Sequence, residues 1–382
     1  MAGLGSDVSL ADLERDPDPI LAAMRRDEPV CWVPELEMWF VTRWDDVAYL
    51  EDHPDVFAAA TDPSFLARAL GPNMLTSDPP EHTRVQQLFA PTFQPGGFSG
   101  EFVADELALL ADGLLEPLGE RFDVMSVYAQ PLSAGSLAAV LGLGDHGADA
   151  VWSWCEGLCT DIANFTNDPD MTRVGEVAKA ELGEAIRATM ADVGAVAGGI
   201  ANFVAAGASE DEIINNVRLM ISGGINEPRD GIGLVTWVLL TRHDLRSEVA
   251  ADPRLMRRLV EEVFRLYTPV GTVTRQATAD VELSGASIKR GDLVSGILRS
   301  VNLDESHWTS PEEIRLDRRE GSHAAFALGA HRCLGEWLGR QEVRVGVERL
   351  FAAFPGLALD ESQPVELHGF EFRGPRSLWV TR

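Results

Sequence analysis

The sequence predicts a mostly α-helical protein with small β-sheets, an α+β arrangement. Helical patterns occupy much of the middle of the chain, at roughly 99–117, 124–142, 147–165 and 171–192. Short stretches rich in β-branched and aromatic residues, bounded by turn residues, predict strands nearer the two ends. No internal repeat or low-complexity linker separates these patterns, although a length of 382 residues alone would suggest two or three domains.

The N-terminal quarter combines short elements with irregular stretches. Residues 1–15 are polar and are expected to be flexible. The run Asp16-Pro17-Asp18-Pro19 predicts a helix start, because a proline in the first turn has no helical hydrogen bond to lose. Two strands, one helix and one irregular segment are then expected over Val30–Val33, Met38–Thr42, Trp44–Glu51 and Pro54–Asn73. The prolines after Asp78 predict the start of another helix.

The longest helical pattern runs from Glu210 to His243, with Ser209 as its N-cap. Its interior contains several helix-breaking residues: Gly223, Gly224, Pro228, Gly231 and Gly233. Glycine costs about 1 kcal/mol and proline about 3 kcal/mol inside a helix. We therefore expect the helix to be kinked or locally widened, a distortion that often marks a functional site. The alternative is two shorter helices that flank a loop.

The last third of the chain returns to mixed structure. A helix is expected over Leu255–Tyr267, ended by Pro269, and residues 270–294 predict strands. A closing helix is expected over Trp337–Phe354, and the segment GFEFRG at 369–374 predicts a short hairpin.

The chain is strongly acidic, with a net charge of −28 and a pI near 4.6. This charge argues against nucleic acid or an anionic membrane as a partner. No apolar run near the N-terminus is long enough for a membrane anchor and no signal peptide is visible, so we expect a cytoplasmic protein. Cys155 and Cys159 share one face of a predicted helix, and packing explains them better than a metal site.

The segment FALGAHRCLGEWLGRQE, residues 326–342, carries the strongest chemical signal. Its glycines allow the backbone to approach a flat group closely. Cys333 precedes a predicted helix, where backbone amides favour the thiolate and should lower the pKa of the thiol. Such a thiolate could ligate haem iron, and His331 and Arg332 could hold an acidic group of the cofactor. A buried cysteine in a glycine-containing turn is the alternative.

The pattern F-x-x-G-x-H-x-C-x-G formed by Phe326, Gly329, His331, Cys333 and Gly335 resembles the haem-ligand loop of the cytochrome P-450 family. Ala327 stands where that family usually has glycine.

A second segment, DPPEHTR at 78–84, resembles a family signature whose histidine binds a haem propionate. His82 matches that histidine, whereas Gln86 replaces the basic residue expected four positions later.

Two further segments resemble family motifs in the expected order. Gly223-Gly224-Ile225-Asn226-Glu227 aligns with [AG]-G-x-[DE]-T of the long central helix, with Asn226 at the acid position and Glu227 at the alcohol position. Glu262 and Arg265 match the E-x-x-R motif, which implies a buried structural ion pair. The Asn-Glu pair resembles a variant found in family members that demethylate small methoxyaromatic compounds.

The resemblance implies one catalytic domain over residues 16–382, built as the cytochrome P-450 fold. It implies haem b as cofactor, Cys333 as the ligand of its iron, and His82, Arg275, Phe326, Gly329 and His331 as further haem-binding residues. Gly223, Gly224, Asn226 and Glu227 would serve catalysis. The substrate would meet Phe165, Val273, Thr274 and Phe372, together with Val270 and with Phe57 or Phe65.

The implied activity is a haem-thiolate monooxygenase that uses O2 to hydroxylate or O-demethylate a small to medium apolar substrate. An aromatic ring is one option for that substrate, and a larger terpenoid or polyketide is another. Asn226 cannot act as an acid, whereas burial could raise the pKa of Glu227 toward neutrality. Two alternatives stay open: a peroxide-driven peroxygenase, and a non-catalytic haem-binding or sensing protein. A helical scaffold without haem is a third.

Electrons would come from a ferredoxin and its reductase, or from a fused reductase domain. We expect Arg332, Arg340 and Arg344 to form a local basic patch that attracts an acidic ferredoxin.

Overall fold

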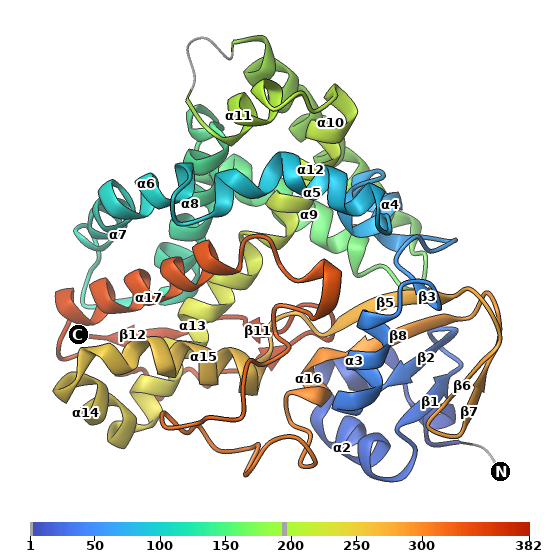
Figure 1. Cartoon of the computed structure of the whole chain (residues 1–382). Helices are drawn as coiled ribbons and strands as arrows, with labels where there is room; N and C mark the ends of the chain where they lie inside the picture. The colour runs from blue at the N-terminus through green and yellow to red at the C-terminus, as the bar shows by residue number, and fades with distance from the viewer. Residues whose placement is uncertain (1–2, 193–196) are drawn as a thin grey trace.

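A large helical region and a smaller region built on a sheet make up the computed structural model, which describes residues 3–192 and 197–382 (Figure 1). In Figure 1 the five-stranded sheet lies at the lower right, and most helices lie above it and to its left. The predicted mostly helical class with small sheets is confirmed. None of the helices in the described ranges combines the length and apolar character needed to cross a lipid bilayer.

The N-terminal segment differs from the flexible one expected. Beyond residues 1–2, which lie outside the described residues, it forms η1 (Leu4–Asp7) and α1 (Leu10–Arg15). The Ser9 side chain accepts a hydrogen bond from the Asp12 amide and caps α1. Leu13 is completely buried. Val8 and Leu10 pack against the same apolar cluster as Leu13, and the Gly5 amide donates to Cys31 Sγ, so several contacts hold the segment against the protein. Helix α2 (Asp18–Asp27) follows, with Pro19 in its first turn as predicted.

The main sheet has the strand order β1-β2-β8-β5-β3. Its strands are β1 (Val30–Val33), β2 (Met38–Val41), β3 (Phe57–Ala58), β5 (Thr272–Ala277) and β8 (Leu293–Ile297). Strands β2 and β8 pair in parallel, with Met38 opposite Leu293, and the other pairs are antiparallel. The sheet thus joins the N-terminal quarter to the segment that follows the central helices.

The remaining strands form small sheets. Strands β6 (Val281–Leu283) and β7 (Ala286–Ile288) make a hairpin, β4 (Arg121–Asp123), β12 (Trp379–Thr381) and β9 (Ala358–Leu359) make a three-stranded sheet, and β10 (Leu367–His368) pairs with β11 (Gly374–Pro375).

Between residues 16 and 93 the helices agree with the sequence prediction except between residues 54 and 73. That stretch contains β3 and α4 (Phe65–Leu70) in place of a wholly irregular segment. Ser64 caps α4 by accepting a hydrogen bond from the Ala67 amide, a short capping signal that the apolar pattern does not reveal. The other elements up to residue 115 are α3 (Trp44–Asp52), η2 (Met74–Thr76), α5 (Glu81–Phe93), α6 (Phe98–Asp105) and α7 (Leu107–Leu115).

The helices that follow complete the upper part of the molecule in Figure 1. They are η3 (Met125–Ala129), α8 (Gln130–Leu141), η4 (Gly144–His146), α9 (Ala148–Ile162), α10 (Pro169–Ala191) and α11 (Gly199–Ala205).

The predicted long helix is divided into α12 (Glu210–Gly223) and α13 (Asn226–Thr241). Only Gly224 and Ile225 separate the two, so the interruption is a local break at the place predicted rather than a loop. Pro228 lies in the first turn of α13, where the missing amide is harmless.

Gly231 and Gly233 do not distort α13, contrary to the prediction. A Cβ atom at Gly231 would lie 2.7 Å from Val343 Cγ2, and one at Gly233 would lie 2.3 Å from Met125 Sδ. These two glycines let neighbouring elements approach the helix closely.

The C-terminal third packs around α13. Helix α15 (Met256–Tyr267) and α17 (Glu336–Ala353) both pack against α13. The remaining elements are α14 (His243–Ala251), η5 (Pro253–Leu255), α16 (Leu298–Val301) and η6 (Gly329–His331).

Candidate active site

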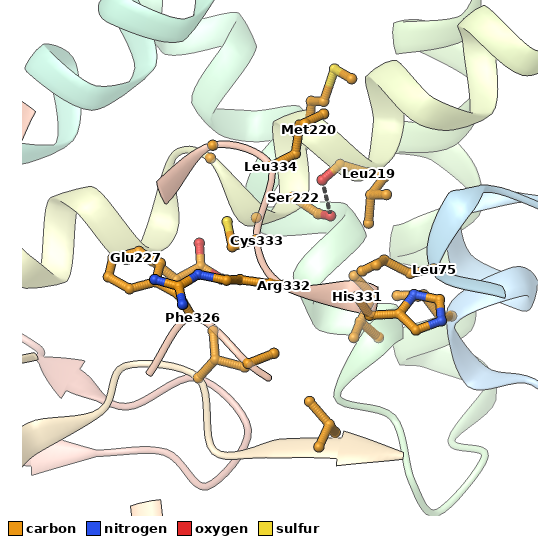
Figure 2. A pocket seen from close by; sticks show the side chains of 18 of the residues that line it. Leu75, Leu219, Met220, Ser222, Glu227, Phe326, His331, Arg332, Cys333 and Leu334 are labelled. Carbon is orange, nitrogen blue, oxygen red and sulfur yellow. Dashed lines mark hydrogen bonds between the residues drawn. The ribbon is translucent and has the colours of Figure 1, made fainter. Parts of the chain in front are cut away.

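A cavity of about 370 Å³ lies between the central helices, the segment 325–335 and the main sheet. Figure 2 shows this pocket with Cys333, Glu227 and His331 among the side chains that line it. Residues far apart in the sequence meet here, since α5, α9, α12, α13, β5, α17 and the turn between β10 and β11 all contribute to its walls. A mostly apolar cavity with few polar groups is typical of small-molecule sites.

The segment before Cys333 is a tight turn that brings backbone to the cavity. Ala327 has φ of 57° and Gly329 has φ of 59°, so both adopt the left-handed conformation. A Cβ atom at Gly329 would lie 2.6 Å from the Glu51 carbonyl oxygen, so only glycine fits there. The Cys333 amide donates to the Phe326 carbonyl at 2.9 Å and closes the turn. The alanine at position 327 therefore keeps the turn despite its unfavourable φ.

The thiol of Cys333 is accessible from the cavity, and protein surrounds it on its other sides. Burial raises its pKa to about 11, and the Gly335 amide opposes this only in part. The prediction that the helix start lowers the pKa of the Cys333 thiol is therefore wrong for the protein without a bound metal. Helix α17 begins three residues later, at Glu336, whose carboxylate also disfavours the thiolate. A cation such as iron would be needed to stabilise the thiolate.

Polar side chains meet at another part of the cavity wall. The rings of His82 and His331 lie 4.1 Å apart between centroids. Within the described ranges, His82 Nδ1 and both ring nitrogens of His331 are buried without a hydrogen-bond partner. Burial lowers the pKa of both residues, that of His331 to about 3, and the nearby Arg275 contributes to each shift.

Arg275 donates to Glu51 Oε2 at 2.8 Å and also lines the cavity. Unpartnered histidines beside an arginine are suited to carboxylate groups. A thiol in the wall, a glycine turn with exposed backbone and this polar cluster together fit haem, a flat cofactor that carries two carboxylates.

The break between α12 and α13 places Gly223, Gly224 and Glu227 in the cavity wall. Asn226 is not among the cavity-lining residues, and Ser222, which the sequence reasoning missed, is. At the first turn of a helix, side chains one position apart point in different directions. Asn226 is therefore less well placed than Glu227 for contact with a substrate or cofactor.

The carboxyl of Glu227 is buried, and burial raises its pKa well above the ordinary value. Its Oε2 has no hydrogen-bond partner in the part of the chain that the structure describes. The arginines nearest to Glu227 in the sequence do not pair with it. Arg229 donates to Asp230 at 2.6 Å, and Arg218 donates to the Lys179 carbonyl at 2.6 Å. Burial thus favours the protonated form of Glu227, whose side chain lines the cavity.

Aromatic and β-branched residues form a further part of the cavity wall. Phe165, Val270, Val273, Thr274 and Phe372 line the cavity as expected. Phe65 also lines it and meets Phe165 edge to face, with 5.6 Å between ring centroids. Phe57 is fully buried against Tyr49 and is not part of the wall, so Phe65 is the aromatic residue of that segment that faces the substrate space.

Two acidic residues of the wall were missed by the sequence reasoning. Glu342 on α17 and Glu371 in the turn between β10 and β11 both line the cavity. The signal for Glu371 was a carboxyl between two phenylalanines in GFEFRG. Glu342 follows the cysteine segment on the buried face of a helix, and its charge alone did not indicate burial.

Glu262 and Arg265 form a buried ion pair at 3.0 Å, with exposed side-chain fractions of 7% and 1%. Arg318 donates to the same carboxylate at 2.9 Å. Arg265 also donates to the carbonyls of Pro311 and Glu313 and so fixes the long segment before the cysteine turn. Neither residue lines the cavity, and the pair stabilises the fold behind the cysteine turn.

The predicted basic patch is neutralised by carboxylates. Arg332 pairs with Glu336 at 2.9 Å, Arg340 with Glu261 at 2.7 Å and Arg344 with Glu348 at 2.8 Å. Arg340 also covers the Phe326 ring at 4.1 Å. The sequence shows arginines at i, i+4 spacing from glutamates, and those pairs form.

Comparisons with known proteins agree with this geometry. Residues 241–370 match the family model described as Cytochrome P-450. The chain is 28% identical to steroid C26-monooxygenase of Mycolicibacterium smegmatis, over 81% of this chain and 79% of that protein. It is 29% identical to mycinamicin IV hydroxylase/epoxidase of Micromonospora griseorubida, over 90% of this chain and 89% of that protein. The solved structure of CalO2 superposes with a TM-score of 0.87 at 28% identity, covering 97% of both chains.

Proposed function

The chain belongs to the cytochrome P-450 family and is a haem-dependent oxidoreductase, and we propose that it hydroxylates or O-demethylates a small to medium apolar substrate in the cavity beside Cys333. The observation that carries this proposal is the arrangement of one wall: a cavity-facing thiol, a glycine turn and unpartnered histidines. Haem b, when bound there, supplies reductive activation of O2. Substrate C–H, O2, two electrons and two protons give C–OH and water.

We assign separate tasks to the side chains of the cavity. Cys333 would hold the iron, and His82, His331 and Arg275 would hold the carboxylates of the cofactor. Glu227 would hold and return a proton on the side of the cavity where O2 is reduced, because burial raises the pKa of its carboxyl and its Oε2 has no partner among the described residues. Phe65, Phe165 and Phe372 would exclude water and orient an apolar ring.

The electron donor we propose is a ferredoxin with its reductase, or a fused reductase domain. Arg332, Arg340 and Arg344 are each paired with a carboxylate, so these three residues add little net positive charge to this face. Docking there would therefore depend on shape and hydrogen bonds more than on long-range attraction.

A peroxygenase activity is a second candidate, favoured by the free carboxyl of Glu227. A protonated carboxyl at this place could donate its proton to the oxygen that leaves as water, while its other oxygen accepts one proton of H2O2. The overall balance is substrate C–H plus H2O2 giving C–OH plus water, with no external electrons.

The first test concerns Cys333. Cys333→Ser should abolish the red-shifted Soret band of the ferrous carbonyl form, because that band reports a thiolate ligand. Cys159→Ser is the matched control and should keep the band. A band that survives Cys333→Ser and disappears in Cys159→Ser would contradict the assignment.

A further inference from the structure

We propose that Glu371 anchors the substrate by pairing with a positively charged nitrogen, so that the natural substrate is an apolar molecule carrying a basic amine. This inference rests on the proposed function, since it names the substrate class of the same cavity. Glu371 lines that cavity from the turn between β10 and β11.

The backbone of this turn is fixed against the segment that precedes β5. The Gly271 amide donates to the Glu371 carbonyl at 2.8 Å, and the Arg373 amide donates to the Pro269 carbonyl at 2.8 Å. Val270 and Phe372 form a β-bridge between the same two segments. A Cβ atom at Gly271 would lie 2.1 Å from the Phe370 carbonyl oxygen, so the two segments are in direct contact. The position of Glu371 is therefore set before any ligand binds.

One oxygen of the carboxyl is held and the other is free for a ligand. The Thr272 hydroxyl donates to Glu371 Oε2 at 2.7 Å. Oε1 accepts no hydrogen bond from any residue that the structure describes, and it is not enclosed. A group bound in the cavity can therefore approach Oε1 while Thr272 keeps the carboxyl oriented.

The charged groups around Glu371 do not neutralise it. Arg373 on the same turn donates to the carbonyls of Glu14 and Gly369 and is directed away from the carboxyl. Glu14 on α1 has the same sign, and it lies 3.4 Å from His368 on β10. Glu227 on α13 has the same sign too, and Glu371 helps to raise the pKa of its carboxyl.

Arg275 on β5 is paired with Glu51. Burial, with a contribution from Glu14, raises the pKa of Glu371 to about 7. No cation among residues 3–192 and 197–382 is paired with this carboxyl. A bound ammonium group would supply the missing counter-ion and would favour the charged form of the carboxylate.

The experiment compares two probes on the haem-loaded protein by calorimetry. One is a phenylbutyl-trimethylammonium ion and the other is its neutral analogue, in which a tert-butyl group replaces trimethylammonium. The two have the same shape, and the quaternary nitrogen has no lone pair with which to ligate iron. Glu371→Gln keeps an acceptor for Thr272 and removes only the charge. Glu366→Gln, an exposed position of the same hairpin region, is the matched control.

We expect Glu371→Gln to weaken binding of the ammonium probe at least tenfold and to change binding of the neutral probe less than twofold. Glu366→Gln should change neither. At pH 7 the ammonium probe should also release part of a proton from wild type, seen as a binding heat that depends on the buffer, and none from Glu371→Gln. Equal ammonium binding in wild type and Glu371→Gln would overturn the proposal, as would loss of this binding in Glu227→Gln alone.

This result is separable from that of the Cys333 test. An intact carbonyl Soret band together with unchanged ammonium binding in Glu371→Gln would overturn the anchor and leave the proposed monooxygenase standing. A red-shifted band that survives Cys333→Ser would overturn the assignment of Cys333 as the iron ligand, and calorimetry of the two probes would still report on Glu371.

Discussion

The acidic residues of the cavity differ in their surroundings, and this difference separates their roles. Glu227 has no polar partner at Oε2 within the described residues and lies at the helix break. Glu371 is held by Thr272 in the wall that faces the substrate. Two carboxyls in unlike environments can take different roles in one site. Glu227 is accordingly the group that we expect to move protons.

The second prediction therefore concerns Glu227. Glu227→Gln should lower the peroxide-driven rate by about 10²–10⁴, because the amide cannot accept and return a proton. Glu227→Thr should also lose peroxide activity but keep turnover with a reductase. The measurement is product formation with each oxidant, in variants that retain the carbonyl Soret band. Equal peroxide-driven rates in wild type and Glu227→Gln would contradict a role for Glu227 in proton transfer.

Sequence reasoning performs well for residues that belong to a spaced pattern. The resemblance of two motifs to a known family implies Cys333, Gly329, His331 and His82 as site residues, and all of them line or adjoin one cavity. The sign of the Cys333 pKa shift could not be predicted, because burial depends on residues from several other elements. The same limit explains the failure to predict Glu371, whose role arises from contacts with residues about a hundred positions away.

At the scale of elements, the packing of α13 against α15 and α17 sets the positions of these helices beside the cavity. Gly231 lies where these helices meet, and an added Cβ there would be 2.7 Å from Val343 and 3.1 Å from the Phe264 ring. The prediction expected one distortion among Gly223, Gly224, Pro228, Gly231 and Gly233, treated alike, and the break lies at Gly224 and Ile225. Whether a glycine breaks a helix or admits a neighbour depends on the partner surface, which sequence alone does not show.

The third prediction compares two glycines in helices. Gly231→Ala should destabilise the protein by about 1–3 kcal/mol, because overpacking outweighs the better helix propensity of alanine. Gly113→Ala in α7, where nothing lies within 4 Å of the added Cβ, should instead stabilise it by up to about 1 kcal/mol. Both changes can be measured as shifts in the urea midpoint. A stabilising Gly231→Ala would contradict the packing argument.

At the scale of the whole molecule, the fold could be predicted well and the distribution of charge only in part. Helix and strand positions follow from local patterns, which explains the agreement for α9, α10, α15 and α17. The net charge of −28 was visible, but the pairing of Arg332, Arg340 and Arg344 on the outer face depends on side-chain geometry. Several carboxyls are buried without cations, and these link the stability of the molecule to pH.

Glu342 provides the clearest case. Its side chain is almost fully buried in α17, with 1% of the residue exposed. Neither carboxyl oxygen has a hydrogen-bond partner among the residues described, although the Ser136 hydroxyl lies near. Burial raises its pKa to about 8, so the folded protein holds this carboxyl neutral at pH 7. In the unfolded chain a glutamate ionises near pH ~4.3.

The folded state therefore binds one proton more than the unfolded state between these two pKa values. The stability due to the neutral carboxyl is fully present below pH ~4.3 and is lost as pH rises through about 8, at up to about 1.4 kcal/mol per pH unit. The amide in Glu342→Gln does not titrate. We expect the free energy of unfolding of this variant to rise relative to wild type by about 2–4 kcal/mol between pH 5 and pH 8. Urea unfolding at a series of pH values measures this difference, with Glu348→Gln on the same helix as the control for removing one carboxylate that is paired with Arg344. A difference between Glu342→Gln and wild type that stays constant over this range would show that Glu342 is ionised in the folded protein.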